Sequence, residues 1–318
     1  MKNFLCAVLV VLPLAGQVRI TQPAPGRVAV EINGQPFTEL FAGPETNKPY
    51  LHPLRSATGK VVTRGYPMQN LPGETHDHPH HRGLWFAHGD VNGFDFWGNE
   101  KRGDKFGLIV LEQVKSAKGG KDTGAVDAVF EWRDPAGKPL LTEARGMTFY
   151  AQPDIRTIDF DILLTARGKV TFGDTKEGTF AVRLAPGLEE PSRNAPAQPK
   201  RTGHMVDSQG RVGEKQIWGK RADWVDYYGI VDGEPLGVAI FDHPSNPRHP
   251  PWWHARGYGL FAVNIFGLHD FENDKSKNGS LTLDTGGTLR FRYRVLIHPG
   301  DVRSADIPAR YAEYQLTH

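Results

Sequence analysis

The chain consists of short stretches in which hydrophobic and polar residues alternate, separated by turns rich in glycine and proline. The pattern is clearest in residues 156–166, where the even positions from 158 to 164 are all apolar. Thr157, Asp159 and Asp161 lie between them, and only position 163 departs from the alternation. Successive side chains of a strand point to opposite faces of its sheet, so this stretch predicts a strand that is buried on one face.

Turn signals divide most of the chain into further strands of this kind. Asn33-Gly34, Asp232-Gly233 and Gly286-Gly287 are dipeptides typical of tight hairpin turns. Each follows a predicted strand, and we expect hairpins that join 227–231 to 236–241 and 280–283 to 289–297. The remaining predicted strands are 27–32, 106–114, 125–132 and 179–184.

The content of helix breakers favours an all-β protein. Thirty-six glycines and twenty-four prolines leave few windows for an amphipathic helix. Only residues 304–315 are typical of a helix, and Ser304 could cap it. We therefore predict one large two-sheet sandwich with one short C-terminal helix. Residues 186–200 are expected to be a long exposed loop inside this domain rather than a boundary.

The N-terminal residues predict export. Lys2 precedes an apolar run over residues 4–14 and the small pair Ala15-Gly16, which is typical of a cleavable signal peptide. We expect a signal peptide at 1–17, a single domain at 18–318 and a secreted or periplasmic location. The only cysteine lies in the segment to be removed, which excludes thiol catalysis and disulfides in the mature chain.

Charge and hydropathy narrow the range of partners. Thirty-eight basic and thirty-six acidic side chains are mixed along the chain, so nothing favours nucleic acid as a partner. No apolar stretch after the predicted signal is long enough to span a membrane.

Residues 74–90 hold five of the thirteen histidines of the chain. His76, His78 and His80 are spaced two apart and would share one face of a strand. Pro79 cannot donate to a sheet ladder, so a loop or an edge strand is expected instead, with only some of these histidines converging.

Histidine at this density indicates either a metal site or acid–base chemistry, and the sequence leaves both open. His76, His78 and His80 are candidate ligands for a divalent metal ion. Without a metal, we expect His78, His80 and His81 to act as catalytic acids or bases.

Two further segments add candidate residues near these histidines. Asn92 and Asp95 could hydrogen-bond a substrate, and Trp97 could stack on a sugar ring. Glu177 lies just before the predicted strand 179–184, where it could point into a cleft as an acid, a base or a ligand.

The segment 242–269 mixes histidines with tryptophans and one arginine. His254 is a candidate for proton transfer, and Arg256 is suited to orient a substrate through its planar fork. His243 is a candidate substrate-binding residue, and Trp252 and Trp253 are expected to extend the stacking wall.

Three runs of sequence resemble the PmoA-like family of exported bacterial proteins. They are DHPHHRGLWFAHGDVNGFDFWG, DTKEGTFAVRLAPGL and HPPWWHARGYGLFAVNIFG, and the resemblance covers most of the chain after residue 17. It implies one domain, a β-supersandwich similar to galactose mutarotases, and a setting of carbohydrate breakdown.

Together these features predict a secreted carbohydrate-active enzyme, a hydrolase, lyase or epimerase that acts on a glycoside or an oxidised sugar. Two alternatives stay open at this point. One is a non-catalytic carbohydrate-binding protein. The other is a metal-dependent oxidoreductase, which the family's name, methane oxygenase, implies.

Overall fold

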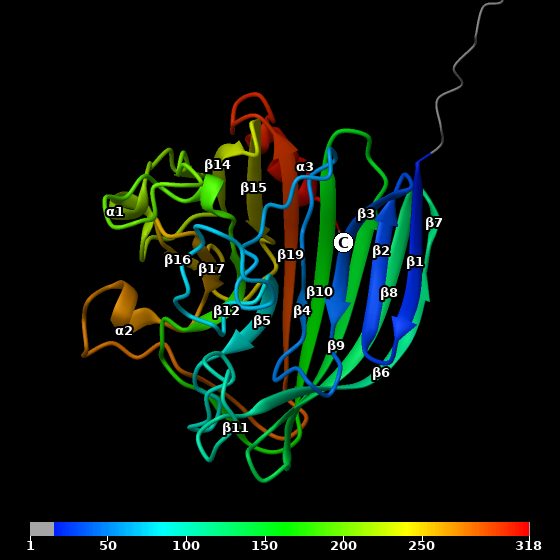
Figure 1. Ribbon diagram of the computed structural model, residues 1–318. Coiled ribbons are helices and arrows are strands. Elements are labelled where there is room, and N and C mark those ends of the chain that lie inside the picture. The colour runs from blue at the N-terminus through cyan, green and yellow to red at the C-terminus, as the bar shows by residue number, and fades with distance from the viewer. Residues whose placement is uncertain (1–15, 318) are drawn as a thin grey trace, which may run out of the picture.

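A computed structural model describes residues 16–317. The predicted signal peptide lies almost entirely outside the described residues. Among residues 16–317 the chain is an all-β sandwich of two large sheets, with a small two-stranded sheet at one end (Figure 1). Neighbouring strands pair antiparallel in every ladder among these residues.

The first sheet has nine strands, in the order β16 (Trp252–Ala255), β17 (Leu260–Asn264), β12 (Gly178–Arg183), β5 (Leu84–His88), β4 (Tyr50–Leu51), β3 (Gln35–Phe41), β2 (Arg27–Ile32), β1 (Gln17–Ala24) and β7 (Gly120–Lys121). The second sheet has eight, in the order β13 (His204–Asp207), β14 (Trp224–Val231), β15 (Glu234–Asp242), β19 (Thr288–Pro299), β10 (Arg156–Ala166), β9 (Pro139–Tyr150), β8 (Thr123–Arg133) and β6 (Leu108–Lys118). β11 (Val170–Phe172) and β18 (Leu281–Leu283) form the two-stranded sheet.

Aromatic side chains fill the space between the two large sheets. Phe86 of β5 lies 5.9 Å from Trp132 of β8, ring centroid to ring centroid. Phe180 of β12 lies 4.5 Å from Tyr293 of β19. These rings are almost completely buried, and burial of such large apolar surfaces is the main source of stability in a sandwich without disulfides.

The predicted alternation is confirmed in β10, which occupies residues 156–166 and buries every even position. Two predicted hairpins are also confirmed, at Asn33-Gly34 and at Asp232-Gly233, where both residues of each turn have positive φ. The third hairpin was wrong. β18 pairs with β11, whereas β19 pairs with β10 and β15, so Gly286-Gly287 joins strands of different sheets.

Helices are few and short. α1 (Glu214–Ile217) and α2 (Leu268–Phe271) are single turns, and α3 (Ile307–Tyr314) is the predicted C-terminal helix. Its N-cap is Asp306, not Ser304, whose hydroxyl instead bonds Asp301. The predicted exposed loop 186–200 is confirmed only in part: residues 191–200 are mostly exposed, whereas Pro186–Leu188 form a buried 3-10 helix and Glu189 is buried as well. No helix in the described part of the chain is long and apolar enough to cross a membrane.

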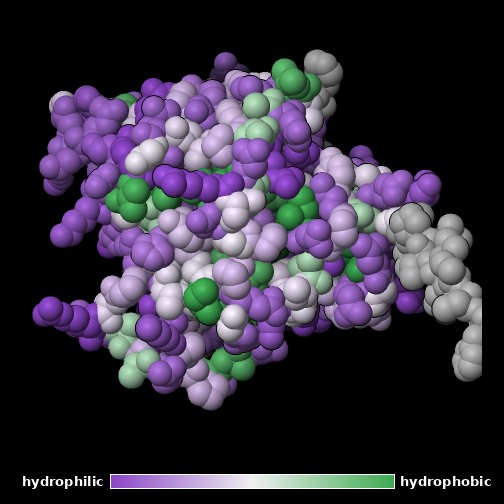
Figure 2. Space-filling view, turned by 90° about the horizontal axis from the view of Figure 1, so that it is seen from above, coloured by the Kyte–Doolittle hydropathy of each residue, from purple (hydrophilic) through white to green (hydrophobic). Residues whose placement is uncertain are grey.

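The surface visible in Figure 2 is mostly hydrophilic, with hydrophobic residues in small separate groups. A surface of this kind fits the mixed charge of the sequence.

Candidate functional site

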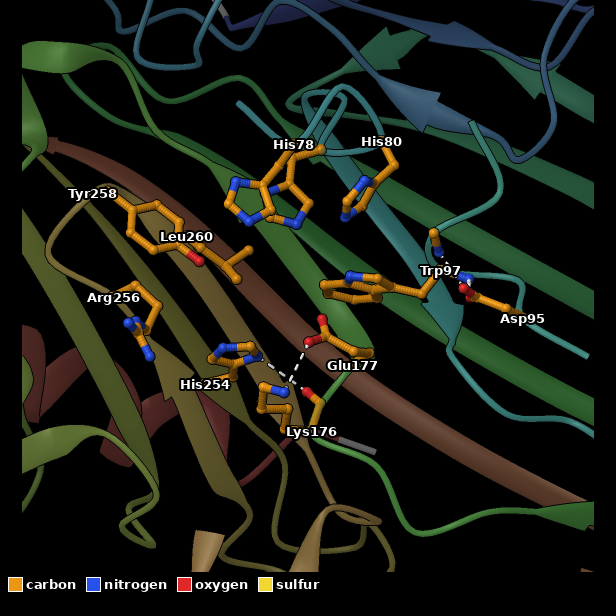
Figure 3. Close-up of a pocket in the computed structure, with 12 residues that line it drawn as sticks. His78, His80, Asp95, Trp97, Lys176, Glu177, His254, Arg256, Tyr258 and Leu260 are labelled. Carbon is orange, nitrogen blue, oxygen red and sulfur yellow. Dashed lines mark hydrogen bonds and ion pairs between the residues drawn. The ribbon is translucent and has the colours of Figure 1, made fainter. Parts of the chain in front are cut away.

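A cavity of about 470 Å³ lies above one end of the nine-stranded sheet, where loops from four parts of the chain meet. Its polar side chains point toward a common space (Figure 3). The lining residues are His78, His80, His81, Asp95, Trp97, Gly98, Lys176, Glu177, His254, Arg256, Tyr258 and Leu260.

Successive side chains of β16 point to opposite faces of the sheet, so only every second one reaches this cavity. Trp253 points to the space between the sheets, where its ring lies 5.5 Å from Phe261. His254 therefore points to the opposite face. Its neighbours across the ladder are Ala262 and then Ala181. These short side chains leave room above the sheet for longer side chains from the loops.

The histidine-rich segment is a loop, as Pro79 predicted. Two fully buried arginines hold it in place, because Arg64 and Arg183 both bond the Oδ1 atom of Asp77, at 2.5 and 2.9 Å. Asp77 in turn accepts a hydrogen bond from His78 through its Oδ2 atom, at 2.9 Å. A buried cationic pair that shares one carboxylate thus fixes the base of the loop.

Stacked rings continue from this loop across one wall of the cavity. His78 stacks on His81 at 4.8 Å and on Tyr258 at 5.4 Å between ring centroids. His81 also packs on Trp85 at 5.3 Å. Its Nδ1 atom lies 3.2 Å from Nη1 of Arg183. Since a guanidinium can only donate, Nδ1 of His81 accepts and the ring proton resides on Nε2.

Lys176 contacts both Glu177 and His254, two candidate acid–base groups of the cavity. Its ammonium lies 3.3 Å from the carboxylate of Glu177. Its backbone oxygen accepts a hydrogen bond from Nδ1 of His254, at 3.0 Å. Figure 3 shows Glu177 and His254 beside Lys176, facing the same space. With its proton on Nδ1, neutral His254 presents the Nε2 lone pair as an acceptor.

The opposite wall is the loop that follows β5. Asp95 accepts hydrogen bonds from the backbone amides of Trp97 and Gly98, both at 2.7 Å. The buried ammonium of Lys48 donates to the backbone oxygen of Trp97 at 2.7 Å and to Asn99 at 2.8 Å. These bonds fix the Trp97 ring, which lines the cavity with only 1% of its surface exposed.

Burial controls the protonation of the cavity histidines. It lowers the pKa of His80 to about 3, and the charge of Lys48 acts in the same direction. Burial also lowers the pKa of His254 to about 3, because its bond to Lys176 only partly opposes the loss of hydration. Both imidazoles are therefore neutral at physiological pH.

Asp95 and Asp77, two acids of the loops around the cavity, have pKa values that are shifted in opposite directions. Burial raises the pKa of Asp95, although the two backbone amides oppose the rise. Burial would also raise the pKa of Asp77, but its bond to His78 and the charges of Arg183 and Arg64 outweigh it and hold the pKa well below its usual range.

Most of the expected site residues meet in the cavity. His78, His80 and His81 line it together with Glu177 and His254, and the expected binding residues Asp95, Trp97 and Arg256 lie beside them. Three segments that are far apart in the chain therefore form one site.

Other expected site residues do not belong to this cavity. Asn92 is exposed in a turn, where its side chain bonds the backbone of Thr171 and Lys169. His243 bonds Ser245 and the backbone of Thr317, near the C-terminal helix.

The expectation that Trp252 and Trp253 extend the stacking wall was also wrong. Trp253 is core, and its Nε1 donates to the backbone of Ala222. Trp252 is 7% exposed and packs under the guanidinium of Arg221, outside the cavity. The sequence showed two adjacent aromatic residues, but not which face of the sheet each side chain of this short strand points to.

Two polar side chains that line the cavity, those of Lys176 and Tyr258, received no role from the sequence. The sequence offered one signal for each residue. Lys176 is next to Glu177, and Tyr258 follows Arg256 by two residues in the same tight hairpin.

The three-histidine metal site is not formed in this arrangement. His76 is exposed and stacks on Tyr66 at 4.6 Å, while His78 and His80 line the cavity. Within residues 16–317, no group of three or more histidine, cysteine, aspartate or glutamate side chains is arranged to hold a metal ion.

Comparisons with known proteins give a family and a likeness in fold. A family model described as "Family of unknown function (DUF6807)" matches residues 27–312. No curated protein matches the sequence.

Solved structures similar to this chain include two enzymes and one related protein. The galactosidase domain of an alpha-galactosidase-sucrose kinase has 10% identity and a TM-score of 0.42, over 89% of this chain and 42% of that chain. An alpha-galactosidase from Lactobacillus brevis has 10% identity and a TM-score of 0.36, over 90% and 40%.

A galactose mutarotase-like protein from Clostridium acetobutylicum has 12% identity and a TM-score of 0.36, over 89% of this chain and 98% of that chain. This chain spans about two fifths of the length of the alpha-galactosidases. At these identities the likeness concerns the fold alone.

Proposed function

The chain belongs to DUF6807, a family of unknown function, and we propose that its cavity is the active site of an enzyme that transforms a sugar by acid–base catalysis. The main support for this proposal is that Glu177 and His254 are both bonded to Lys176. A carboxylate and a neutral imidazole face one space, and each is oriented by a bond to the same residue.

The two groups are suited to different parts of a proton transfer. Glu177 is about one-third exposed and held by the Lys176 ammonium, so its carboxylate is available as a general base or, once protonated, as an acid. His254 can accept a hydrogen bond from a substrate hydroxyl through Nε2. Together they can orient a hydroxyl and exchange its proton.

His80 completes the set from the other side of the cavity. Its ring makes no hydrogen bond with the described part of the chain, and burial keeps it neutral. A neutral imidazole can donate through one nitrogen and accept through the other. This arrangement suits a substrate with several hydroxyl groups, and a sugar is the simplest such substrate.

Hydrolases, lyases and epimerases all use this proton transfer, and their products distinguish them. A hydrolase releases a new reducing end. A lyase leaves a carbon–carbon double bond that absorbs ultraviolet light. An epimerase that works by proton abstraction breaks a C–H bond and forms a C–D bond in deuterated solvent, and it leaves the glycosidic bond intact.

The test is a substrate screen over neutral, acidic and keto glycosides with the three readouts above. Turnover should be lost in Glu177→Gln and kept in Glu234→Gln. Glu234 is a matched control, because it lies outside the cavity and 3.9 Å from Lys60.

Other outcomes would favour the alternatives. Sugar binding without turnover, unaffected by Glu177→Gln, would favour a non-catalytic carbohydrate-binding protein. Turnover that needs added copper or iron together with oxygen would favour a metal-dependent oxidoreductase.

Export is part of the proposal. The signal-like residues 1–17 motivate it. N-terminal sequencing of protein recovered from the periplasm or medium of an expressing bacterium should give a mature start near residue 18. Retention of the intact N-terminus in the cytoplasm would contradict export.

A further inference from the structure

Two cationic side chains lie on the same side of the cavity, flanking His254 (Figure 3). Arg256 is the first. Its Nε lies 3.0 Å from a carboxylate oxygen of Glu214, and its two terminal nitrogens donate no hydrogen bond to residues 16–317. The side chain is 34% exposed, so this half of the guanidinium fork is open to a ligand.

Lys176 is the second cation. Its side chain is 40% exposed, and its single ionic contact in the described chain is with Glu177 at 3.3 Å. An ammonium has three protons, so at least two are available to a ligand. Arg256 and Lys176 are the two side chains of permanent positive charge among the residues that line the cavity.

The charges of Arg256 and Lys176 affect the neighbouring His254. After burial, the charges of Arg256 and Lys176 are the main factors that lower the pKa of His254, and the charge of Asp270 opposes them. On the far wall, Asp95 has one carboxylate oxygen committed to two backbone amides. Arg256 and Lys176 are each paired with one carboxylate, Glu214 and Glu177, so what this corner offers a ligand is the remaining N–H donors of two charged groups.

The aromatic rings of the cavity offer little free surface. Trp97 is 1% exposed. One face of Tyr258 packs on the His78 ring, and the guanidinium carbon of Arg183 lies 4.6 Å from its centroid. Neutral sugars usually depend on an open aromatic face for affinity. Recognition in this cavity depends instead on charge and hydrogen bonds.

We infer that the substrate is a sugar acid whose carboxylate is held by the terminal nitrogens of Arg256, beside Lys176. A planar carboxylate matches the guanidinium fork, and a charge-assisted bidentate pair gives both affinity and orientation. This inference rests on the proposed function, since it places the rest of the sugar ring next to Glu177 and His254.

The test is calorimetric titration with matched ligands. The ligands are glucuronate, galacturonate and mannuronate, free and as short oligosaccharides, each beside its neutral sugar and its uronate methyl ester. We expect each productive acid to bind at least about tenfold tighter than its neutral partner. The ester should behave as the neutral sugar, and added salt should reduce only the binding of the acid.

Three variants locate the interaction. Arg256→Gln should weaken acid binding by about 10- to 100-fold and change neutral binding by less than about twofold. Arg256→Lys keeps the charge but not the fork, so an intermediate loss is expected. Arg290→Gln is the control, because Arg290 pairs with Asp161 on the other sheet, outside the cavity. Unchanged melting temperatures show that the variants fold.

The outcomes separate the inference from the proposed function. Equal binding of neutral and acidic sugars, or an acid preference that survives Arg256→Gln, overturns the inference and leaves a sugar enzyme standing. If no member of any pair binds or reacts, the proposed function fails and the inference fails with it.

Discussion

The Nδ1 atom of His254 donates a hydrogen bond to the backbone oxygen of Lys176, at 3.0 Å. This bond joins the edge strand β16 to the loop before β12, almost eighty residues earlier in the chain. It fixes the tautomer of the imidazole and, through the backbone of Lys176, the start of the segment that carries Glu177. One hydrogen bond thus orients both candidate acid–base groups.

The tautomer of His254 is directly measurable. We predict that nitrogen-detected NMR finds the proton on Nδ1 and none on Nε2 from pH 5 to pH 8, because burial lowers the pKa of this residue to about 3. The chemical shifts of exposed His204 serve as a comparison in the same spectra. A proton on Nε2, or a titration midpoint near 6.5, would contradict the proposed role as acceptor.

Removal of the candidate base should affect rate more than stability. Glu177→Gln keeps the size and polarity of a side chain that is already partly exposed, so the melting temperature should change little. Once a substrate is known, kcat should fall by about 10²- to 10⁴-fold, the usual contribution of a positioned acid or base. A decrease in binding with kcat unchanged would instead assign Glu177 to substrate binding.

The fold was largely predictable because positions along a strand are buried and exposed in turn, and apolar and polar residues alternate in the sequence accordingly. In β10 every buried position from 158 to 166 is apolar and the positions between them are partly exposed, so the alternation of the sequence located this strand. Turn dipeptides located the bends as well. They could not specify pairing partners, and Gly286-Gly287 shows this, because the strands on either side of it join different sheets.

The site was predictable in residue type and only in part in geometry. Histidine, glutamate and arginine rarely gather near aromatic residues without a polar cavity, and this brought His80, Glu177 and Arg256 together correctly. A strand of four residues gives too little alternation to decide its inward face, so Trp253 was assigned to the cavity although it is core. The supporting Arg64 and Arg183 carry no local signal, since their role depends on contacts with a distant loop.

The burial of Trp253 between the sheets has a measurable consequence. Trp253→Ala should reduce the free energy of unfolding by about 3–5 kcal/mol, because it opens a cavity between the sheets. Trp252→Ala should reduce it less, since that ring lies at the edge and packs on Arg221. Neither change should alter the affinity of the folded protein for a sugar. If Trp252→Ala lost sugar binding at unchanged stability, the expected stacking role of Trp252 would be supported after all.

Lys48 provides a prediction about the loop that carries Trp97. Its ammonium is buried and bonds the backbone oxygen of Trp97 and the side chain of Asn99. Lys48→Met keeps the length of the side chain but leaves both oxygens without their donor. We expect lower stability and weaker sugar binding together, measured by denaturant unfolding and by calorimetry. Unchanged binding in the folded variant would show that the loop is held in place without Lys48.

Buried histidines should make the protein sensitive to acid. His88 is fully buried, its Nε2 donates to the backbone oxygen of Gly173 at 2.8 Å, and burial lowers its pKa to about 4. The unfolded chain binds a proton at this residue below about pH 6.5, whereas the folded chain does so only below about pH 4. The contribution of His88 to stability is therefore complete above pH 6.5 and is lost as the pH falls toward 4.

His88→Gln removes this titration and keeps a donor for Gly173. The free energy of unfolding, measured by urea titration between pH 4 and 6.5, should then depend less steeply on pH, by at most about 1.4 kcal/mol per pH unit for the one proton involved. His204→Gln is the matched control for the histidine-to-glutamine change itself, because His204 is exposed. An equal slope in wild type and His88→Gln would mean that His88 takes up its proton in the folded state, and that its burial does not make the fold sensitive to acid.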